Sequence, residues 1–317
     1  MKMNVIRVDS VSKSFGDHRA VEKISFEVSK GEMVALVGAD GAGKTTTIRM
    51  LCGIVPADEG KLSVCGFDVQ EQSSEVKKRI GYLSQRFSLY SDLTIDENIE
   101  FFAEIHGVTR YKERSEQLLE FTRLTPFRSR LAENLSGGMK QKLALACTLI
   151  HTPEVIFLDE PTAGVDPVSR RDFWKILSDL LKTGITILMT TPYLDEAERC
   201  SRVAMMNEGR ILVCDTPQHL KSMMQETLVE LVCAYIRNAF ALLKSEKACR
   251  EVQAFGDRLH LVLRNGKRGM STVLDHLKKN SIAVSSHRVI VPSLENVFIS
   301  LLSEGSLANE QLEGVAK

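Results

Sequence analysis

Long apolar runs are missing from this chain. No uninterrupted apolar stretch among its 317 residues approaches the ~18 residues that a membrane-spanning helix needs. The first residues, Met1 to Val5, also lack the apolar stretch of a signal peptide. The sequence therefore predicts a chain that is soluble by itself, so that any role at a membrane comes through a partner.

Patterned cysteines and an excess of one charge are missing as well. The seven cysteines are scattered without a C-x-x-C pair, which suits a reducing cytosol better than a disulfide or zinc framework. Basic and acidic residues number 41 each, so composition gives no case for binding nucleic acid or an anionic membrane. We expect no nucleic-acid partner.

The most informative segment is a glycine-rich loop that fits the phosphate-loop pattern G-x-x-x-x-G-K-[ST]. It consists of Gly38, Ala39, Asp40, Gly41, Ala42, Gly43, Lys44 and Thr45. An apolar, strand-like run precedes it at 33–37, and a helix-like segment follows at 44–51. The glycines let backbone N–H groups approach phosphate oxygens, and the helix N-terminus favours an anion.

The polar side chains of this loop have distinct expected roles. Lys44 is a point charge for the β- and γ-phosphates, Thr45 offers a hydroxyl to Mg²⁺, and Thr46 is placed for the α-phosphate. The alternative is a chance glycine-rich turn, which the strand and helix on either side of the loop oppose. We therefore expect bound ATP and Mg²⁺.

A second strong signal is a buried, strand-like run at 155–158 that ends in Asp159 and Glu160. Ligands bind at the carboxyl ends of strands in parallel α/β sheets. Asp159 is placed to hold Mg²⁺, and Glu160 can orient or deprotonate an attacking water. The alternative is an acid pair that caps a helix.

Three weaker signals each have an ordinary alternative. Phe15 could stack on a nucleotide base or be a core residue. Gln85 ends a strand-like segment and could reach a metal or a water, or be one surface glutamine among many. Ser136, Gly137 and Gly138 could bring N–H groups to an anion, or form a simple turn before a helix at 140–150.

Periodicity and composition predict the domain organisation. We expect an α/β phosphate-loop ATPase with a mixed core sheet over residues 1–220 and an inserted α-helical subdomain at about 88–150. A capping box at Thr94 to Glu97 begins the first inserted helix, and a second covers 111–122. A βαββαβ order then predicts a small ferredoxin-like α+β domain over 221–304, followed by a flexible tail at 305–317.

The order of these motifs resembles the ATP-binding cassette (ABC) family over about Val5 to Leu220. The resemblance implies that Phe15 stacks on adenine and that Gln85 senses both Mg²⁺ and a transmembrane partner. The resemblance implies that Lys44, Gln85 and Glu160 are catalytic residues. It also implies that Thr45, Gln85 and Asp159 bind the metal. Cassettes of the family work as head-to-tail dimers. The signature Ser136, Gly137 and Gly138 would therefore cap the γ-phosphate of ATP on the opposing subunit, and Asp166 would communicate across the dimer.

Finer features resemble particular members of the family. The segment after Pro217, with residues 292–298, is similar to the C-terminal extension of ATPase subunits in bacterial drug-type exporters. Residues 135–149 and 193–198 are similar to the N-terminal cassette of tandem-cassette efflux ATPases. This likeness implies an ATPase on the cytoplasmic face of the membrane, with a separate integral permease and a second cassette as partners. Coupling to the permease would involve residues 87–94.

One departure from the family concerns Pro192, which occupies the position of the switch histidine. No histidine lies between His151 and His219, and proline has neither a side-chain donor nor an N–H. We expect the chain's own site to bind ATP but to hydrolyse it slowly, while its signature completes a site on another cassette. Pro192 also suits the start of a helix at 193–200 capped by Thr191, and Glu160 acting without the histidine stays an alternative.

Two other functions fit the same motifs. A soluble ABC ATPase acting on ribosomes or DNA is disfavoured, because such proteins usually carry two cassettes or a basic surface, and this chain has one cassette and a net charge of zero. A non-hydrolysing or regulatory cassette of a heterodimer differs from the exporter subunit only in its turnover.

Overall fold

A computed structural model describes residues 3–85, 89–224 and 226–303. These residues fall into two compact units that divide between Asp215 and Thr216. The predicted tail at 305–317 and part of the predicted coupling segment at 87–94 lie outside the described residues. No helix in the described ranges is long and apolar enough to cross a membrane.

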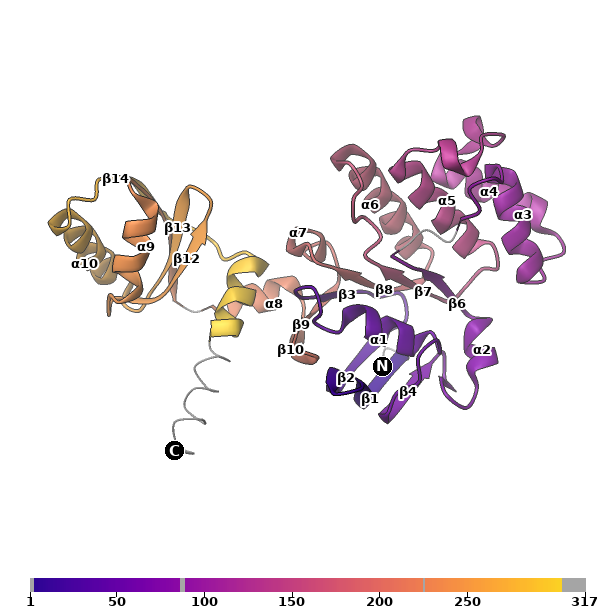
Figure 1. Cartoon of the computed structure of the whole chain (residues 1–317), viewed down its shortest axis with the longest axis horizontal. Helices are drawn as coiled ribbons and strands as arrows, with labels where there is room; N and C mark the ends of the chain where they lie inside the picture. Colours follow the sequence, from indigo (N-terminus) through magenta and orange to yellow (C-terminus); the bar gives the residue numbers. More distant parts are fainter. Residues whose placement is uncertain (1–2, 86–88, 225, 304–317) are drawn as a thin grey trace. The chain divides into compact units, whose positions relative to one another are not determined.

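The first unit contains a six-stranded mixed sheet (Figure 1). Its strands, in sheet order, are β10 (Arg210–Asp215), β9 (Arg202–Asn207), β3 (Met33–Val37), β8 (Thr186–Thr191), β7 (Val155–Asp159) and β6 (Ile80–Leu83). All neighbours from β9 to β6 are parallel, and β10 alone pairs antiparallel. The predicted α/β phosphate-loop fold with a mixed sheet is confirmed.

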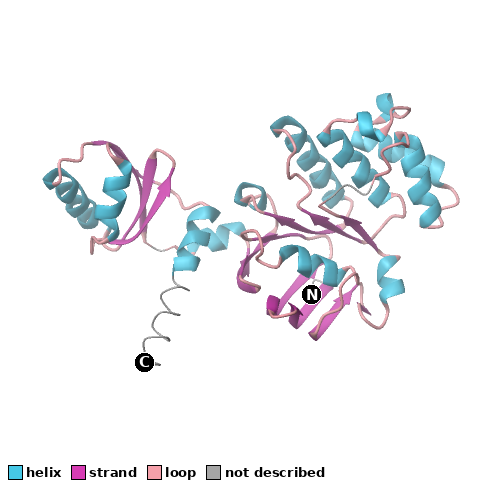
Figure 2. Cartoon of the chain, viewed as in Figure 1, coloured by secondary structure: helices cyan, strands magenta, loops and turns pink. Residues whose placement is uncertain are grey.

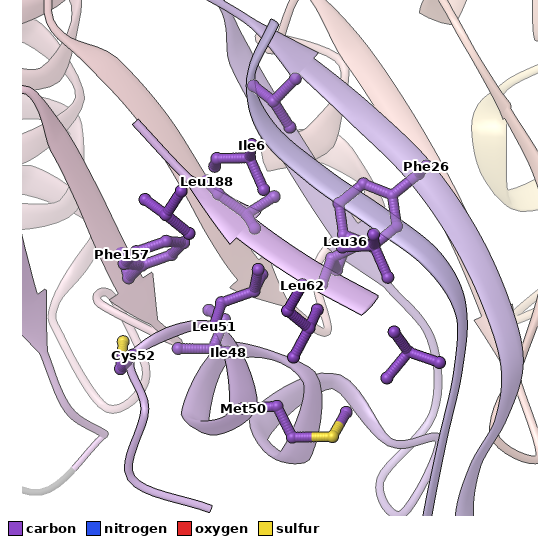
Figure 3. Close-up of a cluster of buried hydrophobic side chains, with 14 of the residues drawn as sticks. Ile6, Phe26, Leu36, Ile48, Met50, Leu51, Cys52, Leu62, Phe157 and Leu188 are labelled. Carbon is purple, nitrogen blue, oxygen red and sulfur yellow. The ribbon is translucent and has the colours of Figure 1, made fainter. Parts of the chain in front are cut away.

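A second, antiparallel sheet of the first unit was not predicted. It contains β2 (His18–Ser29), β1 (Asn4–Phe15), β4 (Glu59–Val64) and β5 (Phe67–Asp68). Helix α1 (Lys44–Leu51) lies between the two sheets and buries Ile48 and Leu51 in a core shared with Leu36 and Phe157 (Figure 3). This packing fixes the start of α1, and with it the glycine-rich loop.

Most helices of the first unit lie between β6 and β8 in the sequence, and Figure 2 draws the helices in cyan. Besides α1, the helices of this unit are α2 (Ser73–Lys77), α3 (Ile95–Ile105), α4 (Tyr111–Thr122), the 3₁₀ turns Thr125–Phe127 and Ala132–Asn134, α5 (Gly137–Leu149), α6 (Pro167–Lys182) and α7 (Leu194–Ala197). The capping box of α3 is present, because the Thr94 side chain accepts from the Glu97 N–H while the Glu97 carboxylate accepts from Thr94. Helix α4 has the predicted bounds.

Helix α5 begins earlier than we predicted. Ser136 is its N-cap and accepts a hydrogen bond from the Met139 N–H, so both glycines belong to the first helical turn. Low helix propensity of glycine suggested a turn that lasted until Lys140. Tertiary packing overrides that preference, because Gly138 sits against Ser169 of α6, where an added Cβ would lie 2.3 Å from the Ser169 Cβ.

The second unit contains the predicted βαββαβ order, preceded by helix α8 (Pro217–Ser222). The elements are β11 (Thr227–Cys233), α9 (Ile236–Lys244), β12 (Cys249–Phe255), β13 (Arg258–Leu263), α10 (Gly266–Lys279) and β14 (Val284–Val289), followed by a helical segment at 294–303. Strand order β12-β13-β11-β14, antiparallel throughout, is that of a ferredoxin-like sheet, as predicted. Helix α10 begins five residues before the predicted Ser271, because Met270 packs into the core of this unit.

Two stacked histidines join the helical segment of the first unit to its sheet. The rings of His106 and His151 lie 3.9 Å apart at an interplanar angle of 9°. His151 Nε2 donates to the Ile80 carbonyl of β6 at 2.8 Å. Burial lowers the pKa of both imidazoles, and the neighbouring His151 lowers the pKa of His106 further. The stack therefore favours two neutral rings.

We expect this stack to make the first unit less stable in mild acid. Well above the ordinary histidine pKa of about 6.5, both rings are neutral in the folded and the unfolded chain, and the contribution of the stack is complete. As the pH falls, the unfolded chain takes up protons first because the folded pKa values are lower, so the free energy of unfolding falls. Denaturant unfolding of the full chain, followed through the fluorescence of its single tryptophan, Trp174 of α6, measures this. His151→Gln should flatten the dependence between pH 7.5 and 5.5, and an unchanged slope would contradict the prediction.

Candidate functional site

Four neighbouring parallel strands bring the predicted site residues to one edge of the sheet. The phosphate loop follows β3, Asp159 ends β7, Thr191 ends β8, and Gln85 lies two residues after β6. The register places Thr190 beside both Leu36 and Asp159. This is the carboxyl edge at which ligands bind in parallel sheets.

A cleft of 380 Å³ opens at this edge. Its lining combines the phosphate loop with residues from distant parts of the sequence: Phe15, His18, Ala20, Asp40, Gly41, Ala42, Gly43, Lys44, Thr45, Thr46, Gln85 and Glu160. All predicted nucleotide-binding residues except Gly38 and Ala39 line it, and the carbonyls of these two accept hydrogen bonds from Lys44.

Lys44 is held inside the loop with its charge directed at the site. Its side chain is 4% exposed, and Nζ donates to the carbonyls of Gly38 at 2.8 Å and Ala39 at 3.0 Å. Nζ also lies 3.7 Å from Glu160 Oε1. The loop requires glycine at Gly43, where φ is +99° and a Cβ would lie 2.4 Å from the Ala20 carbonyl oxygen.

Asp159 is fully buried and only one of its carboxylate oxygens is engaged. Oδ1 accepts from the hydroxyls of Thr45 at 2.9 Å and Thr190 at 2.7 Å. Oδ2 is buried without a hydrogen-bond partner among the described residues. An orphaned carboxylate oxygen beside a threonine hydroxyl fits a hard cation with oxygen ligands such as Mg²⁺, because an unpaired buried anion is costly.

Glu160 has an unusual backbone and two neighbours for its carboxylate. Its φ is 49°, in the left-handed region that costs a non-glycine residue energy and is often found at functional sites. Gln85 Nε2 donates to Oε2 at 2.8 Å, and Lys44 faces Oε1. The structure thus brings Lys44, Gln85 and Glu160 together, and the contact that it gives Gln85 is to Glu160 rather than to Asp159.

Phe15 is not a core residue. The residue is 50% exposed and lines the cleft at the end of β1. Lys13 Nζ lies 5.4 Å from the ring centroid and is itself fixed by Asp58 at 2.6 Å. The half-exposed ring therefore lies at the same cleft as the phosphate loop, where a planar ligand could contact it beside Lys13.

The signature residues lie apart from this cleft, at the N-terminus of α5. Ser136 and Gly137 are exposed, and Gly138 is buried against Ser169. Asp166 is the predicted N-cap of α6 and accepts from the N–H groups of Val168 and Ser169 at 3.0 Å. Hydrogen bonds from Ser169 hold the pKa of Asp166 below its usual range, so this exposed carboxylate is ionised at neutral pH. None of these four residues lines the cleft of its own chain.

The segment around Pro192 differs from our expectation. Thr191 is not the N-cap of a helix over 193–200, because α7 contains only Leu194–Ala197 and its N-cap is Tyr193. Thr191 instead donates to the buried carboxylate of Glu196 at 2.6 Å and accepts from the Tyr193 N–H at 3.1 Å. Pro192 is exposed and follows Thr191, which pairs in register with Val37 just before the phosphate loop.

Several residues near the site were missed by sequence reasoning. Glu196 binds Thr162 and Arg170 as well as Thr191, and so ties α7 to α6. His18 and Ala20 of β2 line the cleft. Thr190 contacts both Asp159 and Glu160. The sequence marks Thr190 only as a polar residue near the end of an apolar strand. Its contacts with Asp159 and Glu160 depend on the order of the strands in the sheet, which local sequence does not state.

The fold and this cleft define a phosphate-loop ATPase cassette. A family model described as ABC transporter matches residues 21–163. The chain is 31% identical to the linearmycin resistance ATP-binding protein LnrL of Bacillus subtilis, covering 94% of this chain and 98% of that protein. It is 34% identical to the daunorubicin resistance ATP-binding protein DrrA2 of Streptomyces coeruleorubidus, covering 93% and 94% respectively.

Other relatives match a smaller share of this chain. A probable multidrug ABC transporter ATP-binding protein of Escherichia coli, YbhF, is 39% identical over 69% of this chain, and the match spans only 38% of YbhF. A solved ATP-binding subunit of an ABC transporter is 28% identical with a TM-score of 0.64, covering 70% of this chain and 93% of that one. The chain therefore belongs to the ABC transporter family as an ATP-binding protein.

Proposed function

We propose that this chain is the ATP-binding subunit of an ABC exporter and works as one half of a head-to-tail cassette dimer on the cytoplasmic face of a membrane. The observation that carries the proposal is the cleft that joins Phe15, the phosphate loop, Gln85 and Glu160. The adenine would stack on Phe15, and the phosphates would lie along the loop and Lys44. Mg²⁺, held through Thr45 and Asp159, would neutralise phosphate charge.

The separation of cleft and signature supports the dimer. Ser136 and Gly137 are exposed at the N-terminus of α5, outside the cleft of the same chain. A second cassette could therefore place its ATP against this helix, where N–H groups and the helix dipole favour phosphate. The relatives named for resistance to linearmycin and daunorubicin support export of a drug-like compound by a separate permease.

The chain's own site is proposed to be slow. Pro192 follows the end of β8 and offers no hydrogen-bond donor to a phosphate or a water. The neighbouring hydroxyl of Thr191 is engaged with Glu196 and the Tyr193 N–H. We therefore propose a heterodimer in which this chain mainly supplies its signature to a catalytic partner cassette.

A hollow lined by Ser84, the residue before Gln85, is the proposed docking place for the permease. This pocket of 310 Å³ lies where β6 meets α3 and α5, and Ile80, Leu83, Leu89 and Phe102 contribute apolar walls. Leu89 belongs to the segment at 87–94, which the family resemblance predicts to couple ATP hydrolysis to the permease. An apolar hollow of this kind suits one helix or turn of an integral partner.

Membrane fractionation in cells that make the protein natively tests this assignment. We expect the wild-type chain to sediment with membranes and Leu89→Glu to shift to the soluble fraction, because a carboxylate would be buried in the docking hollow. Leu212→Glu, a substitution at a 38% exposed leucine of β10, is the matched control and should stay with membranes. Sedimentation of the wild type with ribosomes or nucleic acid would contradict the proposal.

A further inference from the structure

We infer that Thr190 is a positioning residue that sets both carboxylates of the hydrolytic site through one hydroxyl group. This inference rests on the proposed function as an ATP-binding cassette. Thr190 is fully buried in β8, between β3 and β7, and is paired in register with Asp159. Side chains of paired residues in parallel strands point to the same face, so the hydroxyl meets the carboxylate directly.

The hydroxyl uses both of its hydrogen-bonding capacities. It donates to Asp159 Oδ1 at 2.7 Å and accepts from the Glu160 backbone N–H at 2.9 Å. The same N–H also lies 3.2 Å from the Thr190 carbonyl oxygen. Only a hydroxyl of this size can act as donor and acceptor at once, so serine could replace threonine here and valine could not.

For Asp159, this contact decides which oxygen stays free. Oδ1 accepts hydrogen bonds from the hydroxyls of Thr190 and Thr45, while Oδ2 is buried and unpartnered among the described residues. A Thr45 hydroxyl that turns toward a cation would leave Oδ1 held by Thr190 alone. Thr190 therefore keeps the carboxylate turned so that Oδ2 is the oxygen offered to Mg²⁺ or its water shell.

For Glu160, the contact holds a backbone conformation that is otherwise unfavourable. A φ of 49° persists only where the surroundings fix it, and the double hydrogen bond from the Glu160 N–H to Thr190 does so. The fixed backbone presents the carboxylate to Gln85 at 2.8 Å and toward Lys44. The buried Thr190 hydroxyl thus links Asp159, which would face Mg²⁺, to Glu160, which would face the attacking water.

Three variants of the full-length chain test the inference by ATP binding in equilibrium dialysis at varied Mg²⁺ concentration. Thr190→Val should bind ATP without Mg²⁺ as the wild type does, but need about tenfold more Mg²⁺ for its Mg²⁺-dependent tightening. Thr190→Ser should restore the wild-type Mg²⁺ dependence. Thr186→Val is the matched control, because it removes a buried hydroxyl from the same strand that accepts from the Gly31 N–H and makes no contact to Asp159 or Glu160 among the described residues.

Each outcome decides a different question. A wild-type Mg²⁺ requirement in Thr190→Val would overturn the inference while leaving the proposed function intact. Thr190→Ser as impaired as Thr190→Val would also overturn it, by assigning the effect to methyl packing, and an equal shift in Thr186→Val would assign it to general destabilisation. A wild-type chain that binds no ATP at all would instead contradict the proposed function.

Discussion

Gly137→Asp should abolish transport-coupled ATP hydrolysis by the assembled exporter without unfolding the chain. Gly137 is exposed in the first turn of α5, its φ is not in the left-handed region, and an added Cβ would meet no atom within 4 Å. A carboxylate there would face the γ-phosphate of the opposing cassette, where the proposed dimer needs N–H donors. We expect a loss of about 100-fold or more in turnover, the size seen when one stabiliser of transition-state charge is removed.

Protein stability should move in the opposite direction from activity. An acidic residue in the first helical turn favours the helix by about 0.3–1 kcal/mol, and replacing a helical glycine adds a similar amount. The thermal midpoint of Gly137→Asp should therefore equal or exceed that of the wild type. Gly137→Asn is the neutral control and should keep far more activity. Full activity in Gly137→Asp would show that this helix N-terminus does not face the second nucleotide.

Pro192→His should raise hydrolysis at the chain's own site. The residue follows β8, whose last residue, Thr191, pairs with Val37 immediately before the phosphate loop. An imidazole there would supply the donor that proline lacks, and one such group contributes about 100-fold or more to many hydrolytic reactions. Since Glu160 and Gln85 are already proposed to position the water, we expect a gain of at least about tenfold.

Two further variants separate the imidazole from the backbone change. Pro192→Ala restores the backbone N–H but adds no imidazole, so the turnover should stay low. Pro192→His combined with Glu160→Gln should return to the background, because Glu160 is proposed to act on the water. A Pro192→His chain with no rise in turnover in the assembled complex would remove the reason for calling this site weakened.

Local sequence signals predicted those parts of the molecule that local chemistry controls. The capping box at Thr94, the bounds of α4 and the Asp166 cap of α6 each depend on residues within one helical turn. The phosphate loop is specified by glycines that tolerate close approach and positive φ. The ferredoxin-like unit could be predicted because its strands and helices alternate clearly in the sequence.

Contacts between distant segments were beyond the reach of the same signals. Thr190 meets Asp159 because β8 lies beside β7, and no local pattern states that order. Gly138 lies in the first turn of α5 at a place where Ser169 of α6 leaves no room for a side chain. Thr191 bonds to Glu196 rather than capping a long helix, since that buried carboxylate also serves Thr162 and Arg170. Each difference comes from tertiary packing.

The most direct measurement is steady-state ATP hydrolysis by the purified full-length chain, with Glu160→Gln as the blank and MgATP binding measured on the same samples. We expect bound MgATP and turnover equal to the blank, because the cleft contains the phosphate loop, Gln85 and Glu160 while Pro192 is proposed to stand at the position of the switch histidine. That result would support a heterodimer in which this chain mainly supplies Ser136 and its neighbours. Turnover clearly above the blank would contradict it and show that a homodimer of this chain could power transport.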